Sequence, residues 1–337
     1  MRGWLLLVDY RDLPEDQQVA ALRTAAATAA ERFGLEVTGL EVAAHAFNTT
    51  FAVDTKEGER VALRVNTGSQ SGPENVVAQQ EWQRGIAAET DVLVPVPLLT
   101  PDGAWSVEVA SEAYGGPLLV TGASWLEGPD VDEPDAEVAR ELGRAMARLH
   151  LQAEAWSLPD GAAMPVFDTP LFGDEDLLAS AEGLDDDGRA VLDRAREVAD
   201  EGFGALFDGA SLRPLHADLH GGNLKWHAGR LAVFDFDDCG LGLPELDLAI
   251  SAFYLRDVDP APEQAMWEGY ADVTPPPVVD PAHFEAMVAS RQLLLANSLL
   301  ASSNAELRGE AEDYLGVSVR RLARWLATGT FTRAAPS

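Results

Sequence analysis

The apolar pattern of this chain changes once, close to Gly128-Pro129, and this change limits the folds that the chain can adopt. Before it, apolar and polar residues alternate over short runs at 36–44, 50–55 and 60–66, as they do in half-buried strands. After it, apolar residues recur at helical spacing. We therefore predict an antiparallel sheet in the first part of the chain and a mainly helical second part.

Turn and breaker residues set the limits of the expected elements. In the first part, helical spacing also appears at 15–33 and 74–88, and Lys56-Glu57-Gly58-Glu59 predicts a hairpin turn. We predict two domains, 1–122 and 123–330, followed by a tail at 331–337. The helices expected in the second domain are 138–156, 187–206, 245–256, 261–270 and 282–327, with a linker at 275–277.

One segment of the second part carries polar residues at a spacing that suits phosphoryl transfer from ATP. The predicted loop is His216-Ala217-Asp218-Leu219-His220-Gly221-Gly222-Asn223, and two short predicted strands separate it from Phe234-Asp235-Phe236-Asp237-Asp238. This reaction needs a carboxylate that receives or orients the attacking hydroxyl, and oxygen ligands that hold Mg²⁺ on the phosphates. The alternative is a loop in which Asp and Asn only cap turns. Because spacing and flanking strands agree, we favour the catalytic interpretation.

These two motifs, placed after a β-rich part, resemble those of the aminoglycoside phosphotransferase and choline kinase branch of the protein-kinase-like superfamily. Within that branch the chain is similar to bacterial stress-response kinases and homoserine-kinase-like phosphotransferases. Weaker signals lie at Trp125-Leu126-Glu127-Gly128, Leu149-His150 and Trp267-Glu268-Gly269-Tyr270. The resemblance implies an α+β, bilobal protein-kinase-like fold with a β-rich N-lobe and a mainly helical C-lobe.

The resemblance also implies a role for the main residues of the two motifs. Asp218 is the expected base or hydroxyl-orienting carboxylate, and its main work is to position the nucleophile. His216 is expected to brace the loop. Asn223 and Asp235 are the expected Mg²⁺ ligands, since oxygen ligands suit a hard cation.

Three further polar residues are expected to support this group. Asp237 either contacts a metal ion or water, or faces solvent. His220 either touches the transferred phosphoryl group or supports the loop, and we favour support. Asp247 falls on an apolar predicted helix, where a buried carboxylate must be hydrogen-bonded, and the resemblance implies that it accepts backbone N–H groups of the loop.

The expected nucleotide-binding residues depart from the protein-kinase pattern. Arg64 stands where such a kinase has a lysine, and its expected partner is Glu81, although both residues could also be ordinary surface charges. The phosphate-covering loop lacks the Gly-x-Gly-x-x-Gly pattern, and Asn48 is the candidate for a side-chain contact to phosphate. Backbone groups at 118–125 are expected to pair with the adenine.

The formal net charge of −32 bears on the partners of the chain. A surface this acidic repels phosphates, so we predict no nucleic-acid binding. Two explanations of the charge stay open. The first, which we favour, is a solvated acidic surface that keeps the protein soluble, for example in a salty cytoplasm. The second is attraction of a cationic acceptor. In so acidic a chain, single carboxylates carry little information about an acceptor site. The candidates for a cation cage are Trp125, Trp156, Trp267 and Tyr270, although aromatic residues at helical spacing more often belong to a core.

The chain shows no sign of a membrane or an export signal. No run of 18 apolar residues exists, and the apolar run at 4–8 ends at Asp9 without a cleavage pattern. The single cysteine, Cys239, suits a reducing compartment. We therefore expect a cytoplasmic protein with no membrane partner, and we predict no particular oligomeric state.

The expected activity is ATP- and Mg²⁺-dependent phosphoryl transfer to a hydroxyl of a small molecule, such as an aminoglycoside, choline or homoserine. One alternative is a protein Ser/Thr kinase of the bacterial stress-response type. A second alternative is a nucleotide-binding pseudokinase, which the degenerate phosphate loop and Arg64 would suit. No Ala-Pro-Glu signature follows Asp235, which argues against control by a phosphorylated activation loop.

Overall fold

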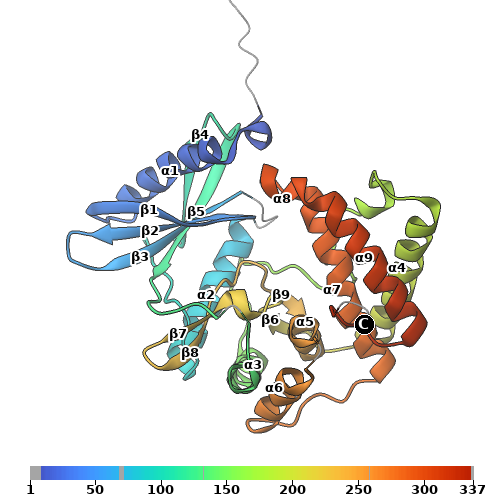
Figure 1. Ribbon diagram of the computed structural model, residues 1–337. Coiled ribbons are helices and arrows are strands. Elements are labelled where there is room, and N and C mark those ends of the chain that lie inside the picture. The colour runs from blue at the N-terminus through green and yellow to red at the C-terminus, as the bar shows by residue number, and fades with distance from the viewer. Residues whose placement is uncertain (1–8, 68–71, 132, 258, 335–337) are drawn as a thin grey trace, which may run out of the picture. The chain divides into compact units, whose positions relative to one another are not determined.

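The computed structural model describes residues 9–67, 72–131, 133–257 and 259–334, which form two compact units (Figure 1). The first unit draws on 1–76, 96–125 and 301–310. The second draws on 77–95, 126–300 and 311–337. The apolar run at 4–8 lies outside the described residues.

The first unit is a five-stranded antiparallel sheet with one long helix beside it (Figure 1). The order of the strands is β1-β2-β3-β5-β4, so β4 and β5 form a hairpin that joins the sheet through β5. The elements are η1 (Tyr10–Asp12), α1 (Glu15–Arg32), β1 (Val37–His45), β2 (Thr49–Thr55), β3 (Arg60–Asn66), β4 (Ser106–Ser111), β5 (Gly116–Ser124) and α8 (Ala305–Gly309). The predicted strands at 36–44, 50–55 and 60–66 are confirmed within about a residue.

Alternation along the strands explains how α1 packs on the sheet. Phe51 and Leu63 are fully buried on neighbouring strands and belong to one core with Leu22 and Ala26 of α1. Small alanines on this face of the helix let its backbone approach the sheet closely. The hairpin turn predicted at 56–59 connects β2 to β3.

The second unit is mainly helical, with two short antiparallel ribbons. One ribbon pairs β6 with β9, and the other pairs β7 with β8. The elements are α2 (Pro73–Glu89, from Val77 onward), α3 (Ala136–Ala155), η2 (Leu178–Ser180), α4 (Asp186–Phe207), β6 (Arg213–Leu215), η3 (Gly221–Asn223), β7 (Leu224–His227), β8 (Arg230–Val233), β9 (Gly240–Gly242), α5 (Pro244–Leu255), α6 (Ala261–Ala271), α7 (Pro281–Ala301) and α9 (Ala311–Thr328).

Helices α3 and α6 approach each other closely because each has a glycine at the contact. A Cβ atom added to Gly143 would lie 2.0 Å from the carbonyl oxygen of Met266. A Cβ atom added to Gly269 would lie 2.0 Å from the carbonyl oxygen of Arg140. Any side chain at either position would therefore push the two helices apart.

Three features differ from the predicted organisation. The helix expected at 282–327 is three helices, because the Asn304 side chain accepts hydrogen bonds from the N–H groups of Glu306 and Leu307 and starts α8 anew. Residues 77–95 lie before the expected 122/123 boundary but belong to the helical unit, because Trp82 of α2 is part of its core. Residues 301–310 lie after that boundary but belong to the sheet unit. Phe331, in the expected tail, is fully buried in that core.

None of the described helices is long and apolar enough to cross a membrane.

Candidate active site

The two ribbons of the helical unit bring the two motif loops together. Strand β6 leads into the 216–223 loop and β7 leaves it, while β8 leads into the 234–239 loop and β9 leaves it. Leu224 pairs with Val233 across the second ribbon, and the Phe234 N–H donates to the Asn223 carbonyl oxygen at 3.1 Å. Asn223 and Asp235 therefore lie at the same end of this ribbon.

Each loop contains a residue in the left-handed backbone region. Ala217 has a φ of 61° and Asp235 a φ of 67°. Such a conformation costs a non-glycine residue about 1–3 kcal/mol and persists only where neighbouring groups enforce it. In the first loop the enforcing group is Asp247 of α5, which accepts hydrogen bonds from the N–H groups of His216 and Ala217, at 3.2 and 2.7 Å.

Asp247 is itself held by a chain of buried polar groups. It is fully buried, and its carboxylate lies 3.0 Å from His150 Nε2 on α3. The other ring nitrogen of His150 lies 2.9 Å from the Tyr270 hydroxyl on α6. Helices α3, α5 and α6 thus meet at one carboxylate that fixes the backbone before Asp218. The motifs Leu149-His150 and Glu268-Gly269-Tyr270 supply two of these groups.

His216 joins the two loops. Its Nε2 donates to the Phe234 carbonyl oxygen at 2.9 Å, and its Nδ1 accepts from the Asp218 N–H at 3.3 Å. The ring also packs against Phe236, with 4.6 Å between ring centroids. These contacts hold the two loops together, and none of them places His216 on a reacting group.

Asp218 lies at the centre of the site. Its Oδ1 accepts from the Arg291 guanidinium of α7, and its Oδ2 accepts from Asn223 Nδ2 at 2.7 Å and lies 3.4 Å from His220 Nε2. Burial alone would raise the pKa of Asp218, but the charge of Arg291 and the contact with His220 hold that pKa below its usual range. The side chain is 15% exposed, so a ligand can still reach it.

His220 supports this carboxylate from within the loop. Its Nδ1 accepts from the Gly222 N–H at 3.0 Å, which places the proton of the neutral ring on Nε2, toward Asp218. The ring lies against Tyr254 of α5, with 4.5 Å between centroids.

Asn223 and Asp235 offer the oxygen ligands that a hard divalent cation takes. Asn223 Nδ2 donates to the carbonyl oxygen and to Oδ2 of Asp218 and lies 3.4 Å from His220 Nε2, so Asn223 Oδ1 is the remaining acceptor of this amide. In the described part of the chain there is no cluster of three or more His, Cys, Asp or Glu residues that could hold a metal ion by itself. A two-ligand site fits Mg²⁺, which takes its remaining ligands from phosphates and water. Asp237 is partly exposed in the same loop.

The comparisons with known proteins agree with this geometry. A sequence model described as the phosphotransferase enzyme family matches residues 38–282. The chain belongs to this family. The amicoumacin kinase of Bacillus subtilis (strain 168) is 26% identical over 245 residues, which are 72% of this chain and 69% of that protein.

Solved structures show the same fold. The microcompartment-associated aminopropanol kinase matches with a TM-score of 0.71 and 23% identity, over 94% of this chain and 100% of that one. The spectinomycin phosphotransferase APH(9)-Ia matches with a TM-score of 0.61 and 13% identity, over 93% of this chain and 98% of that one. The predicted α+β, protein-kinase-like fold and the family resemblance are confirmed.

The three candidate nucleotide-binding residues are divided between the two units. Arg64 lies on β3, opposite Thr121 of β5. Asn48 is almost fully buried before β2, and its Oδ1 accepts from the Thr67 N–H at 2.9 Å. Glu81 lies on α2 in the helical unit, where it accepts from Arg84 at 2.5 Å. The pairing of Arg64 with Glu81 stays a prediction.

Two aromatic candidates for a cation cage, Trp267 and Tyr270, and the neighbouring Glu268 have structural partners. Glu268 binds Arg140 at 2.7 Å, which ties α6 to α3. Tyr270 is buried against His150, and Trp267 packs on Phe284 with 5.3 Å between centroids. Trp267 and Tyr270 thus belong to the helix packing, which is the alternative that the sequence favoured for the aromatic residues.

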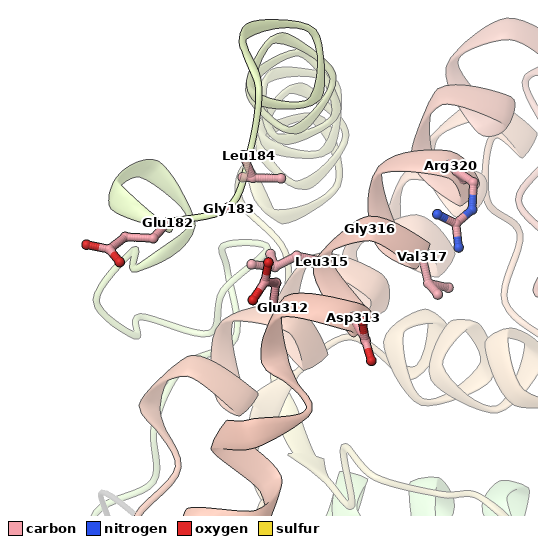
Figure 2. Close-up of a pocket in the computed structure, with 9 residues that line it drawn as sticks. All are labelled: Glu182, Gly183, Leu184, Glu312, Asp313, Leu315, Gly316, Val317 and Arg320. Carbon is pink, nitrogen blue, oxygen red and sulfur yellow. The ribbon is translucent and has the colours of Figure 1, made fainter.

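A pocket of about 450 Å³ lies elsewhere in the helical unit, lined by 182–184 and by the first half of α9 (Figure 2). Glu182 and Glu312 are exposed there, and Arg320 lies farther along α9. None of the predicted site residues lines this pocket.

Two residues of the site carry no motif that could have revealed them. Arg291 is 73 residues from Asp218 in the chain, and Ser251 of α5 donates to the Leu219 carbonyl oxygen at 2.7 Å. The only signal in the sequence was a charged residue inside the apolar stretch 286–294, where a buried charge needs a partner.

Proposed function

We propose that the chain is an ATP-dependent phosphotransferase that transfers the γ-phosphoryl group to a hydroxyl of a small molecule. The observation that carries this proposal is the 2.7 Å hydrogen bond between Asp218 and Asn223. Asp235 lies at the same end of the β7–β8 ribbon as Asn223. The family match supports it. So do the names of the relatives, an amicoumacin kinase, an aminopropanol kinase and a spectinomycin phosphotransferase.

In this proposal Asp218 orients the acceptor hydroxyl. Because its pKa lies below the usual range, the carboxylate is ionised at neutral pH and is a weak base. A weak base suffices in a loose transition state, in which the nucleophile keeps its proton until late and the main requirement is alignment. Arg291, His220 and Asn223 limit the rotation of the carboxylate, so the hydroxyl is held in one direction.

Asn223 Oδ1 and Asp235 are the proposed ligands of the divalent cation, and we propose Mg²⁺ as that cation. Related structures were solved with AMP-PNP and Ca²⁺ and with ADP, which supports the use of a nucleotide and a divalent metal. The cation would neutralise phosphate charge that the acidic chain otherwise repels. Asp237 is proposed as an outer contact of the cation or its water.

Arg64, Glu81 and Asn48 are proposed to serve the nucleotide. Arg64 keeps its charge at any physiological pH and can bind two phosphate oxygens at once. Glu81 would hold that guanidinium, and Asn48 would fix the loop that covers the phosphates. We also propose that the enzyme works in the cytoplasm, where ATP and Mg²⁺ are available; the single buried cysteine is compatible with this.

An ADP-release assay with a panel of hydroxyl acceptors tests this proposal. We expect acceptor-stimulated ADP release that Asp218→Asn lowers at least about a hundredfold, the range of a lost general base or orienting group. Nucleotide binding, followed as the rise in melting temperature with Mg-ATP, should be unchanged in that variant. Absence of ADP release with every acceptor, while Mg-ATP still binds, would favour a pseudokinase, and stimulation by proteins alone would favour a protein kinase.

A further inference from the structure

Arg291 is a buried charge that the family motifs do not account for. It is 6% exposed, and every residue from 286 to 294 around it on α7 is buried. Its Nη2 donates to Asp218 Oδ1 and to the Tyr254 hydroxyl oxygen, which is 3.0 Å away. Its Nε donates to the same hydroxyl at 3.3 Å. The guanidinium thus joins the orienting carboxylate to a tyrosine of α5.

This arrangement leaves hydrogen-bond donors next to Asp218. The Tyr254 oxygen receives both bonds from Arg291, so the proton of that hydroxyl is available to donate. Burial raises the pKa of Tyr254 to about 12, so the proton is present at neutral pH. Within 9–67, 72–131, 133–257 and 259–334, neither this proton nor Arg291 Nη1 donates to a protein oxygen, and Nη1 does not belong to the buried atoms that lack a partner, so it touches solvent. Because Tyr254 is partly exposed and Arg291 Nη1 touches solvent, both donors are within reach of a ligand oxygen beside Asp218.

The charges around Asp218 indicate what kind of group supplies that oxygen. Arg291 compensates the charge of Asp218, so this carboxylate is not available as the anionic half of a cation site. A cationic group placed next to the acceptor hydroxyl would meet the guanidinium, and like charges repel. An anionic group there would receive charge-assisted hydrogen bonds from Arg291.

We propose that Arg291 and Tyr254 bind a carboxylate of the acceptor beside the hydroxyl that Asp218 orients. This inference rests on the proposed phosphotransferase function and names its substrate class: a small hydroxy acid or hydroxy amino acid. The explanation that the acidic chain attracts a cationic acceptor does not apply at this position.

Matched pairs of acceptors that differ only in the carboxylate test the proposal. The pairs are serine with ethanolamine, threonine with 1-aminopropan-2-ol, and homoserine with 3-aminopropan-1-ol, and the readout is kcat/KM for ADP release by the full chain. A second readout for every pair is the rise in melting temperature that the acceptor gives with Mg-ADP present. We expect at least one amino acid to exceed its amino alcohol about tenfold or more, the worth of a charge-assisted hydrogen bond.

Variants show whether Arg291 and Tyr254 cause that preference. Tyr254→Phe removes one donor and leaves the packing, so we expect KM for the amino acid to rise about tenfold while kcat stays within about twofold. Arg291→Gln should abolish the preference, and Arg291→Lys, which keeps the charge, should restore part of it. Tyr10→Phe, the same change in the sheet unit, is the matched control and should change neither constant.

Three results would overturn the inference. The first is that no amino acid exceeds its amino alcohol in the unmodified chain. The second is an equal rise in KM for both members of a pair in Tyr254→Phe. The third is Asp218-dependent turnover confined to acceptors without a carboxylate. Failure of the proposed function differs from all three, because ADP release would then be the same in the unmodified chain and in Asp218→Asn with every acceptor.

Discussion

At the scale of single residues, Asp247 stabilises the site although it lies on α5, outside both motif loops. It accepts hydrogen bonds from two backbone N–H groups and contacts His150. Its removal leaves several buried polar groups unsatisfied, each at a cost of about 1–3 kcal/mol.

We therefore predict that Asp247→Ala lowers the free energy of unfolding by about 3–5 kcal/mol, measured by urea denaturation. Acceptor-stimulated ADP release should fall with it, because Ala217 loses the bonds that enforce its left-handed backbone. Asp187→Ala, at an exposed position of α4, should change stability by less than about 0.5 kcal/mol. Equal effects of both substitutions would contradict this role of Asp247.

His45 gives the sheet unit a dependence of stability on pH. Burial lowers the pKa of His45 in the folded chain, partly offset by the charge of Glu15. Because the unfolded chain then binds the proton more readily, stability is highest above the unfolded pKa of about 6.5 and falls as the pH drops below it. Denaturation of the unmodified chain and of His45→Gln at pH 7.5 and 5.5 measures this. The loss of stability between the two pH values should be smaller in the variant, and an identical loss would refute the prediction.

At the scale of elements, the crossing of α3 and α6 places His150 and Tyr270 against Asp247. The crossing depends on Gly143 and Gly269, because a Cβ atom at either position would lie on a backbone carbonyl of the other helix.

We predict that Gly269→Ala destabilises the chain by at least about 2 kcal/mol and lowers turnover, although alanine is the better helix former. Gly204→Ala is the matched control on α4, where an added Cβ has no atom within 4 Å. That control should stabilise the chain by up to about 1 kcal/mol. Thermal melts of both variants check the prediction, and a stabilising Gly269→Ala would show that the helices can separate without cost.

Local patterns explain which elements could be predicted from the sequence. Asp218, Asn223 and Asp235 lie within 18 residues of one another, so their spacing alone could predict a shared site. The break within 282–327 was missed because helical spacing continues through it, while the cap at Asn304 competes locally with the helix. Arg291 was missed because its partner is 73 residues away, and only the folded chain brings the two together.

At the scale of the whole molecule, charge is the dominant property. A net charge of −32 destabilises the compact state by self-repulsion, which salt screens. We predict that the melting temperature rises between 0.1 M and 2 M KCl, by calorimetry or circular dichroism. A melting temperature that does not change with KCl would remove the explanation of the acidic surface as an adaptation to a salty cytoplasm.

The destination of the γ-phosphoryl group tests the central claim most directly. Mg-ATP labelled at the γ-phosphate is incubated with the chain and the acceptor panel in KCl, and the label is then traced to small molecules, protein or inorganic phosphate. The account predicts label on a small-molecule hydroxyl, lost in Asp218→Asn and in Asp235→Asn. Label on protein or only in inorganic phosphate, or transfer that survives Asp218→Asn, would contradict it.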